Sequence, residues 1–413
     1  MRAGLASVPR EGTGSEPLWS IGDRTLPRLV GPARAEVCVV GLGGTGLTAV
    51  AALTAAGRSV LGVDAGTVAA GAAGRNGGFL LAGPAAFHHR LREQIGREPA
   101  RELYGLTLEA RDRMFADLGG ATAKPCGSFR VPGDAEEERD IRAQYDALLE
   151  DGFAAEWRTE PVGRQSRQGL VVPGDGTFDP ARRCVELANG VANHARLFGS
   201  SPVLEVSPER VVTAAGEVRA DAILVCVDGA LDRLFPLLKE ATPRRPAVRS
   251  LRLQMLATAP APDVDLHRAV YFRQGYDYWQ QRPDGRIALG GGRDRGGDLE
   301  DTDRLGVTEA VQSHLEGLLA DPIGTTAAVT HRWSGVVGYS SDDLPLADEA
   351  VEVGPGVFWA GAYSGHGNVL GTMAGAALAD LALGRPTPRL VRLLREARAE
   401  RKTAEDPPEP GRG

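Results

Sequence analysis

The 413-residue chain has few cysteines, few aromatic residues and almost no lysine. Its four cysteines form no CxxC pair, so neither a zinc site nor a disulfide framework is indicated. No stretch approaches the ~20 apolar residues of a membrane-spanning helix, and the N-terminus lacks the apolar core of a signal peptide. The net charge of −7 argues against a nucleic-acid or anionic-membrane partner. We therefore expect a soluble, cytoplasmic protein without a resident metal ion.

A chain of this length predicts two to three domains. Residues 1–34 are rich in Gly, Pro and Arg and predict an irregular lead-in, although Leu18 and Trp19 are expected to pack on the body. The β-branched run 36–40 predicts a buried parallel strand, followed by a glycine cluster, a helix over 47–56 and a strand over 59–63. Further helices are predicted over 99–118, 136–149, 180–197, 308–319 and 367–383. Residues 250–292 predict a sheet with a hairpin turn at 283–285, and residues 403–413 are expected to be disordered.

The glycine cluster 41–46 matches the pattern G-x-G-x-x-G between a strand and a helix. In such a turn Gly41 permits the tight bend, Gly43 lets the backbone approach a pyrophosphate, and Gly46 allows close helix–strand packing. Asp64 ends the second strand, where a carboxylate accepts hydrogen bonds from ribose hydroxyls and disfavours the 2′-phosphate of NADP. The sequence therefore predicts a bound dinucleotide.

Two further glycine-rich segments favour FAD over NAD. The loop 71–78 follows Asp64 closely and supplies backbone that is suited to a ribityl chain and a flavin edge. The turn 361–368 opens a helix, whose N-terminus would stabilise the negative charge of a reduced flavin. One cofactor domain built from both ends of the chain is the expected result.

The GAAGRNGG loop and the GAYSGHG turn resemble the D-amino-acid-oxidase-type family of FAD-dependent oxidoreductases, most of all its γ-glutamylputrescine oxidase branch. The resemblance covers about residues 15–386. It implies a mixed α/β fold with a Rossmann-type FAD-binding domain and a substrate domain that contains a large antiparallel sheet. The FAD-binding domain is expected to comprise 35–90, 180–245 and 325–390, and the substrate domain 91–179 and 246–324. Residues 391–413 are expected to form a C-terminal helix and a disordered tail.

The resemblance also implies which residues contact FAD. They are Gly41, Gly43, Gly44, Gly46, Asp64, Ala65, Gly74, Arg75, Asn76, Gly77, Gly78, Val203, Gly335, Gly361, Gly365, His366, Gly367 and Asn368. Glycine-oxidase-like members carry a carboxylate-binding arginine where this chain has Val337, which favours an amine or an amino acid held elsewhere. Sarcosine oxidases carry an oxygen-activating lysine where this chain has Ala288. They also carry a flavin-linked cysteine near the Trp333 region with no counterpart here, so FAD is expected to be non-covalent.

Flavin-dependent amine oxidation transfers a hydride from the carbon bearing nitrogen to flavin N5, and it requires a neutral amine in a dry pocket. Aromatic walls exclude water and hold a cationic amine before it loses its proton. The candidate substrate-site residues are Tyr363, Tyr276, Tyr278 and Trp333. Tyr276 and Tyr278 share one face of their strand. Sheet packing explains either tyrosine about equally well, whereas Tyr363 lies in the flavin-facing turn and is the stronger candidate.

The remaining polar candidates have less specific interpretations. His366 is expected to position the cofactor rather than act as a base. Arg75 is expected either to bind backbone carbonyls or to contact the flavin. The pair His88 and His89 is interpreted as surface residues at a helix start. Residues 342–343, both aspartates, are interpreted as a solvated turn rather than as a site for a diamine.

The leading hypothesis is an FAD-dependent oxidase of amines or amino acids, with a small-molecule substrate and molecular oxygen as the acceptor that becomes hydrogen peroxide. An amine dehydrogenase with a quinone or protein acceptor is the nearest alternative, followed by a biosynthetic tailoring oxidase that acts on an amine in a larger precursor. An NAD-dependent dehydrogenase explains the first 65 residues but not the paired glycine turns. A non-catalytic FAD-binding protein is the remaining alternative, and the sequence makes no prediction of oligomeric state.

Overall fold

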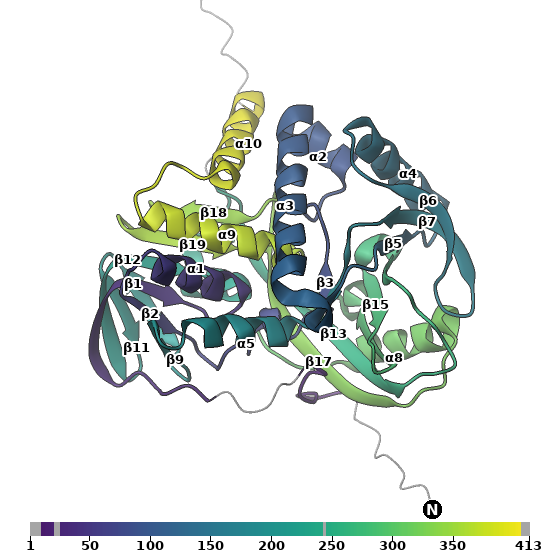
Figure 1. The fold of residues 1–413 in the computed structure, drawn as a ribbon, viewed down its shortest axis with the longest axis horizontal. Coiled ribbons are helices and arrows are strands. Elements are labelled where there is room, and N and C mark those ends of the chain that lie inside the picture. Colours follow the sequence, from purple (N-terminus) through teal and green to yellow (C-terminus); the bar gives the residue numbers. More distant parts are fainter. Residues whose placement is uncertain (1–9, 20–24, 243–244, 406–413) are drawn as a thin grey trace, which may run out of the picture.

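The computed structural model describes residues 10–19, 25–242 and 245–405. Figure 1 shows two large sheets beside each other, with the long helix α3 (Arg97–Thr122) between the helices of the first sheet and the strands of the second. Strands of both sheets come from distant parts of the chain. The expected fold class, a parallel nucleotide-binding sheet combined with a large antiparallel sheet, is confirmed.

The first sheet has a parallel centre with antiparallel edges. Its parallel strands, in spatial order, are β9 (Ala195–Phe198), β2 (Val60–Val63), β1 (Gly31–Val40), β12 (Gly216–Val225) and β19 (Val357–Gly361). Its antiparallel edges are β10 (Val203–Ser207), β11 (Arg210–Thr213) and β18 (Leu346–Glu349). Residues 37–40 of β1 are all buried, because both faces of this strand are covered. The helices α1 (Gly44–Ala55), α5 (Pro180–Val191) and α9 (Gly367–Ala382) pack together over this sheet (Figure 1).

Three predicted boundaries in this half were wrong. The first strand begins at Gly31 rather than at residue 36, because Gly31 and its successors pair in register with β12. The helix predicted over 180–197 ends at Val191, and residues 195–198 form β9 at the edge of the parallel sheet. The C-terminal helix α10 (Arg389–Glu405) includes residues 403–405, which were expected to be disordered, and the rest of that tail lies outside the described residues.

The second sheet has the order β17-β13-β16-β15-β14-β5-β7-β6, and only the β14–β5 pair is parallel. Its strands are β5 (Ser128–Val131), β6 (Glu156–Pro161), β7 (Ser166–Val172), β13 (Val248–Pro260), β14 (Ala269–Phe272), β15 (Asp277–Gln281), β16 (Arg286–Gly291) and β17 (Val329–Ser340). The predicted hairpin turn is confirmed, with Gly285 at a φ of 80°. Strand β17 was expected in the FAD-binding unit, but it pairs with β13 along this sheet.

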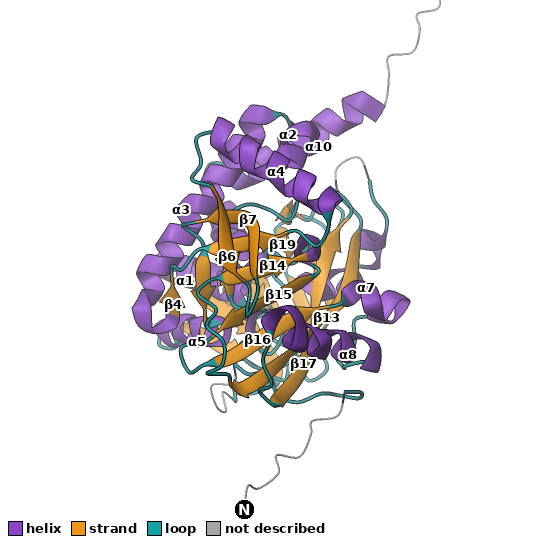
Figure 2. Ribbon diagram, turned by 90° about the vertical axis from the view of Figure 1, so that its right-hand side faces the viewer, coloured by secondary structure: helices purple, strands orange, loops and turns teal. Residues whose placement is uncertain are grey.

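The remaining elements connect and flank the two sheets. A small sheet joins β3 (Phe79–Leu80), β8 (Gly176–Phe178) and β4 (Ala123–Lys124). The other helices are α2 (His88–Ile95), α4 (Ala135–Glu150), α6 (Leu231–Leu234), α7 (Arg293–Gly296) and α8 (Glu309–Leu318). Figure 2 shows α2, α4 and α10 gathered at one end of the molecule, and α8 close to β17. No helix within the described ranges has the length and apolar character needed to cross a bilayer.

Two pairs of adjacent polar residues were expected to lie in solvent, and one member of each pair is buried. His88 begins α2 as expected, but its side chain is fully buried and its Nε2 lies 2.7 Å from Asp151 Oδ2. This contact ties α2 to the end of α4, which is why the interpretation of His88 as a surface residue was wrong. Asp342 is also buried, 3.0 Å from Arg398 Nε of α10, whereas its neighbour Asp343 is exposed as predicted.

Candidate cofactor and substrate site

The fingerprint turn between β1 and α1 is packed so closely that two of its positions admit only glycine. Gly41 has a φ of 99°, and a Cβ at this residue would lie 2.4 Å from the carbonyl oxygen of Cys226. A Cβ at Gly46 would lie 1.8 Å from the carbonyl oxygen of Gly41. A Cβ built at Gly43 would lie 3.1 Å from the Cβ of Ala73. The absence of a side chain at Gly43 therefore lets the loop 71–78 approach the turn.

Asp64 connects the fingerprint turn to the end of β2. Its Oδ2 accepts a hydrogen bond from the Leu42 amide at 2.7 Å, and its Oδ1 accepts one from the Gly66 amide at 2.8 Å. Burial raises the pKa of this carboxyl group, and the two amide hydrogen bonds oppose that rise. Because each oxygen retains a second lone pair, the carboxylate could still accept hydrogen bonds from ribose hydroxyls.

A cavity of about 710 Å³ lies along this turn. Among the predicted cofactor residues, it is lined by Gly41, Gly43, Gly44, Asp64, Ala65, Asn76, Val203, Gly365, Gly367 and Asn368. Two predicted residues are packed behind it: a Cβ at Gly74 would meet Ala69, and one at Gly361 would meet Leu231. The glycines of the turn lie on this cavity at the N-terminus of α1, and their lack of side chains lets a pyrophosphate approach the backbone N–H groups.

Sequence reasoning did not identify Arg183, which also lines this cavity. Its side chain is buried, and its Nη2 donates a hydrogen bond to Thr372 Oγ1 at 2.8 Å. It makes no ion pair within the described ranges, and a Cβ on Gly44 would lie 3.0 Å from its Nη1. Arg183 could therefore neutralise a phosphate beside the start of α1. The available signal was an arginine on the mostly buried face of the predicted helix over 180–197.

The second glycine loop is held in place by hydrogen bonds from its surroundings. Arg75 donates from Nε to the carbonyl of Ala70 at 2.7 Å and from Nη1 to that of Ser334 at 3.2 Å, so it makes the backbone contacts of one of its two predicted roles. Trp333 donates from Nε1 to the carbonyl of Arg75 at 2.8 Å and is fully buried. Trp333 thus supports the loop and lines neither cavity described here.

Asn76 joins this loop to the beginning of α9. Its Oδ1 accepts hydrogen bonds from the Gly78 amide at 2.8 Å and from Asn368 Nδ2 at 3.1 Å. Its Nδ2 donates to the carbonyls of Ala72 and Ala73, both at 3.0 Å. Both ends of its amide are therefore satisfied, and the two glycine-rich segments, far apart in the sequence, are fixed relative to each other.

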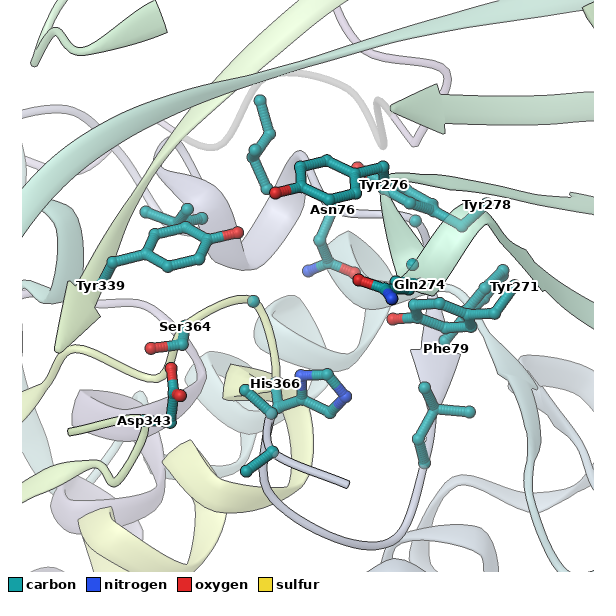
Figure 3. A pocket seen from close by; sticks show the side chains of 18 of the residues that line it. Asn76, Phe79, Tyr271, Gln274, Tyr276, Tyr278, Tyr339, Asp343, Ser364 and His366 are labelled. Carbon is teal, nitrogen blue, oxygen red and sulfur yellow. The ribbon is translucent and has the colours of Figure 1, made fainter. Parts of the chain in front are cut away.

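A second cavity of about 430 Å³ has aromatic walls. Tyr271 and Tyr278 lie with ring centroids 6.0 Å apart, and Phe79 contacts Tyr271 edge-on at 5.4 Å. Figure 3 shows these rings grouped on one side of the cavity, with Tyr276 and Tyr339 across from His366. The ring of Tyr278 packs against Gly77, where a Cβ would lie 2.9 Å from the ring. Tyr276, in the turn before β15, and Tyr278, within β15, both line this cavity.

Tyr363 lies apart from this aromatic group. Its hydroxyl is 2.9 Å from Thr45 Oγ1, and its side chain is buried between α1 and α9. It lines the larger cavity but not the aromatic one. The structure therefore does not bring Tyr363 together with Tyr276 and Tyr278, because the turn directs its ring back towards the fingerprint helix.

His366 lies on the aromatic cavity with its ring stacked on that of Tyr271, at a centroid distance of 6.3 Å. Both of its ring nitrogens are buried without a hydrogen-bond partner of normal geometry among the described residues. Burial, together with the positive charge of Arg130, lowers the pKa of His366 to about 4. His366 is thus neutral at physiological pH and adds no positive charge to the site.

This lowered pKa predicts a specific dependence of stability on pH. The unfolded chain binds a proton at its ordinary pKa of 6.5, whereas the folded chain resists protonation down to about pH 4, so stability falls as the pH drops below about 6.5. Between pH 7.5 and 5 the wild-type apoprotein should lose about 2 kcal/mol relative to H366N in urea unfolding. The exposed His194 provides a control, since H194N should follow the wild type. Parallel pH profiles for the wild type and H366N would contradict this assignment.

The two cavities adjoin at residues that line both of them. These residues are Ala72, Asn76, Val337, Gly365 and Asn368. A nucleotide cofactor that fills the larger cavity would therefore reach an aromatic chamber suited to a small molecule. The parallel sheet, the glycine turn at the N-terminus of α1 and the adjoining chamber define an enzyme of the dinucleotide-binding class.

A family model described as DAO, FAD dependent oxidoreductase, matches residues 36–381, and the chain belongs to this family. It is 28% identical over 389 residues to the probable oxidoreductase OrdL of Rhizobium meliloti, which covers 88% of this chain and 86% of that protein. It is 26% identical over 376 residues to the gamma-glutamylputrescine oxidoreductase of Escherichia coli, with 84% of each chain covered. The structure resembles that of glycine oxidase from Geobacillus kaustophilus with a TM-score of 0.70 and 20% identity, covering 86% of this chain and 96% of that one. The family assignment confirms FAD dependence and an oxidoreductase function.

Proposed function

We propose that this protein oxidises the C–N bond of a small amine or amino acid to an imine, with molecular oxygen as the final acceptor. Bound FAD would supply the two-electron acceptor for the hydride, and oxygen would take up both electrons and two protons to leave as hydrogen peroxide. The observation that carries the proposal is the junction of the larger cavity, beside the fingerprint turn, with the aromatic chamber. Relatives named for gamma-glutamylputrescine and glycine oxidation support the choice of substrate class.

The chain's own residues would orient the substrate and exclude water. The rings of Tyr271, Tyr278 and Phe79 form an apolar wall that can hold a cationic amine and that strengthens electrostatic contacts by removing solvent. Neutral His366 has a nitrogen lone pair available to accept a hydrogen bond from an ammonium group. We propose that Tyr276 closes the same wall, and that the predicted glycine, Asp64, Asn76 and Asn368 positions hold the cofactor.

We also propose a division of the chain into two units. The FAD-binding unit would contain the parallel sheet with α1, α5 and α9, and the substrate unit would contain the antiparallel sheet, including β17. This division keeps the predicted order of segments. It moves residues 329–340 to the substrate unit and adds residues 31–34, the start of β1, to the FAD-binding unit.

An anaerobic absorbance scan of the holoenzyme tests the proposed half-reaction. A panel of amines and amino acids is added to the oxidised protein, and we expect the visible flavin band to bleach with one chemical class. A band that no amine or amino acid bleaches would contradict the proposed oxidation of a C–N bond.

The identity of the electron acceptor requires a separate measurement. Lys124 and Lys239 are exposed and line neither cavity, and Ala288, where related enzymes carry an oxygen-activating lysine, is buried in the antiparallel sheet. This arrangement favours a dehydrogenase as the second candidate function. Stopped-flow mixing of the reduced enzyme with oxygen distinguishes the two, because an oxidase reoxidises within one turnover time whereas a dehydrogenase stays reduced until a quinone is added.

We expect FAD to be released when the protein is denatured. Cys184 and Cys226 line the larger cavity, but burial raises the pKa of Cys184 to about 11 and that of Cys226 to about 12, so neither thiol is ionised at neutral pH. No cysteine lines the aromatic chamber. After precipitation with trichloroacetic acid, the yellow colour should remain in the supernatant, and a yellow pellet would indicate a covalent bond.

A further inference from the structure

Arg130 is a buried arginine on the wall of the aromatic chamber. It lies in the middle of β5, where only 9% of its surface is exposed, and its partner in the neighbouring strand is Tyr271. Its guanidinium group is placed over two rings, 5.2 Å from the centroid of Phe87 and 5.1 Å from that of Tyr271. Both strands are held in the sheet, so this position of the side chain is built into the fold.

The guanidinium group of Arg130 has no polar partner. It makes no hydrogen bond and no ion pair to any residue in the part of the chain that the structure describes. Two other arginines of the chamber have polar partners: Arg90 lies 2.8 Å from Asp140, and Arg75 binds backbone carbonyls. A largely buried charge without a protein partner is costly, and an anion bound beside it offsets that cost.

We propose that Arg130 binds a carboxylate group of the substrate, so that the substrate is an amine that also carries a carboxylate. This inference rests on the proposed function and makes its substrate class more specific. Arg130 lies on β5 and Val337 lies on β17. Four strands separate β5 from β17 in the antiparallel sheet, so the two residues contact the chamber from different places. The carboxylate would therefore be held from a different wall than in glycine-oxidase-like relatives, while His366, one ring away beyond Tyr271, lies towards the cofactor.

The charges of the chamber favour a single carboxylate over a phosphate. A planar guanidinium can bind one carboxylate through two parallel hydrogen bonds, and a monoanion neutralises its single charge. Asp140 and Asp343 also line the chamber and would repel a dianion. Arg293 stacks on Tyr276 and Tyr339 at centroid distances of 5.3 and 5.0 Å, but it is more exposed than Arg130 and can be solvated by water.

Binding of benzoate to the oxidised holoenzyme tests the proposal without turnover. Benzoate combines a carboxylate with a ring that suits aromatic walls, and benzamide is its uncharged counterpart. Titrations are followed by the perturbation of the flavin absorbance band and by calorimetry. We expect the wild type to bind benzoate in preference to benzamide. R130M should weaken benzoate binding by about 10- to 100-fold and leave benzamide unaffected.

The chain offers a matched control in Arg167. This residue lies on β7, next to β5, and also stacks on a ring, 5.6 Å from the centroid of Phe272, but it does not line the chamber. R167M should therefore bind benzoate like the wild type. R130K keeps the charge but loses the paired hydrogen bonds, so its affinity should fall between those of the wild type and R130M. It also provides the comparison if R130M fails to retain FAD.

The outcomes separate this proposal from the proposed function. Wild-type protein that does not bind benzoate at millimolar concentration, or R130M and R130K proteins that bind it unchanged, would overturn the role of Arg130 even if amines bleach the flavin. Benzoate binding that depends on Arg130 would support the carboxylate site even if no amine bleaches the flavin. If phosphate competes with benzoate in the wild type as strongly as acetate does, the preference for a carboxylate is wrong.

Discussion

Replacing Gly46 with alanine should abolish tight binding of FAD. The added Cβ would lie 1.8 Å from the carbonyl oxygen of Gly41. The backbone fixes the positions of both atoms, so no side-chain rotation can relieve the overlap. Relief requires α1 to move away from β1, and this movement displaces the N–H groups at the start of the helix from the cofactor cavity. We expect the affinity for FAD to fall by at least about 100-fold, measured by quenching of FAD fluorescence on titration into the apoprotein.

Gly105 provides the control for this substitution. It lies inside α3, and a Cβ built at this residue meets nothing within 4 Å. G105A should bind FAD like the wild type and should be more stable by roughly 0.5–1 kcal/mol, because alanine has the higher helix propensity. Circular dichroism separates loss of binding from loss of folding in G46A. Normal FAD affinity in a folded G46A protein would show that α1 can move away from β1 without loss of FAD binding, which would contradict the prediction.

The parts of the site that could be predicted from the sequence are those whose chemistry is local. The spacing of Gly41, Gly43 and Gly46 encodes a turn between a strand and a helix, and each of these glycines meets the backbone or a small side chain as such a turn requires. Asp64 follows β2 directly, so its place beside Leu42 is a consequence of two adjacent parallel strands. In these cases one βαβ unit fixes both the spacing of the residues along the chain and their proximity in space.

The predictions that failed concern the direction of a side chain or contacts between distant segments. Tyr363 lies in the expected turn, but the turn directs its ring to Thr45 rather than to the aromatic chamber. His88 begins a helix as predicted, yet Asp151, 63 residues away, covers it. A motif specifies the path of the backbone, whereas these contacts depend on how helices from separate units pack.

Arg130 illustrates what sequence reasoning missed. The strand 128–131 is short, and nothing in it shows that its neighbour is β14 rather than another strand. The available signal was an arginine between Phe129 and Val131 in a run that is otherwise typical of a buried strand. That pattern predicts a buried charge, but only the register with Tyr271 shows that the charge lies on the chamber.

The substitution N76D should be as damaging as G46A, for an electrostatic reason rather than a steric one. The amide nitrogen of Asn76 donates to two carbonyl oxygens, those of Ala72 and Ala73, each at 3.0 Å. A carboxylate in the same place would direct an oxygen at both carbonyls, losing two hydrogen bonds and adding repulsion in a partly buried site. We expect the loop 71–78 to change shape, because both lost hydrogen bonds lie inside it, and the FAD affinity at pH 8 to fall by at least about 100-fold.

The dependence of this effect on pH distinguishes electrostatic repulsion from general disruption. A protonated carboxyl group carries one O–H and can donate to the Ala72 carbonyl, so N76D should regain part of its FAD affinity as the pH falls from 8 to 5.5. N193D is the matched control, because Asn193 is exposed in the turn after α5 and its change should leave FAD binding unaffected at either pH. An affinity of N76D that is low at pH 8 and equally low at pH 5.5 would contradict the electrostatic account. Recovery in N76D alone would show that a donor at this position holds the loop 71–78 in its binding conformation, because protonation restores a donor and removes the negative charge that repels the two carbonyls.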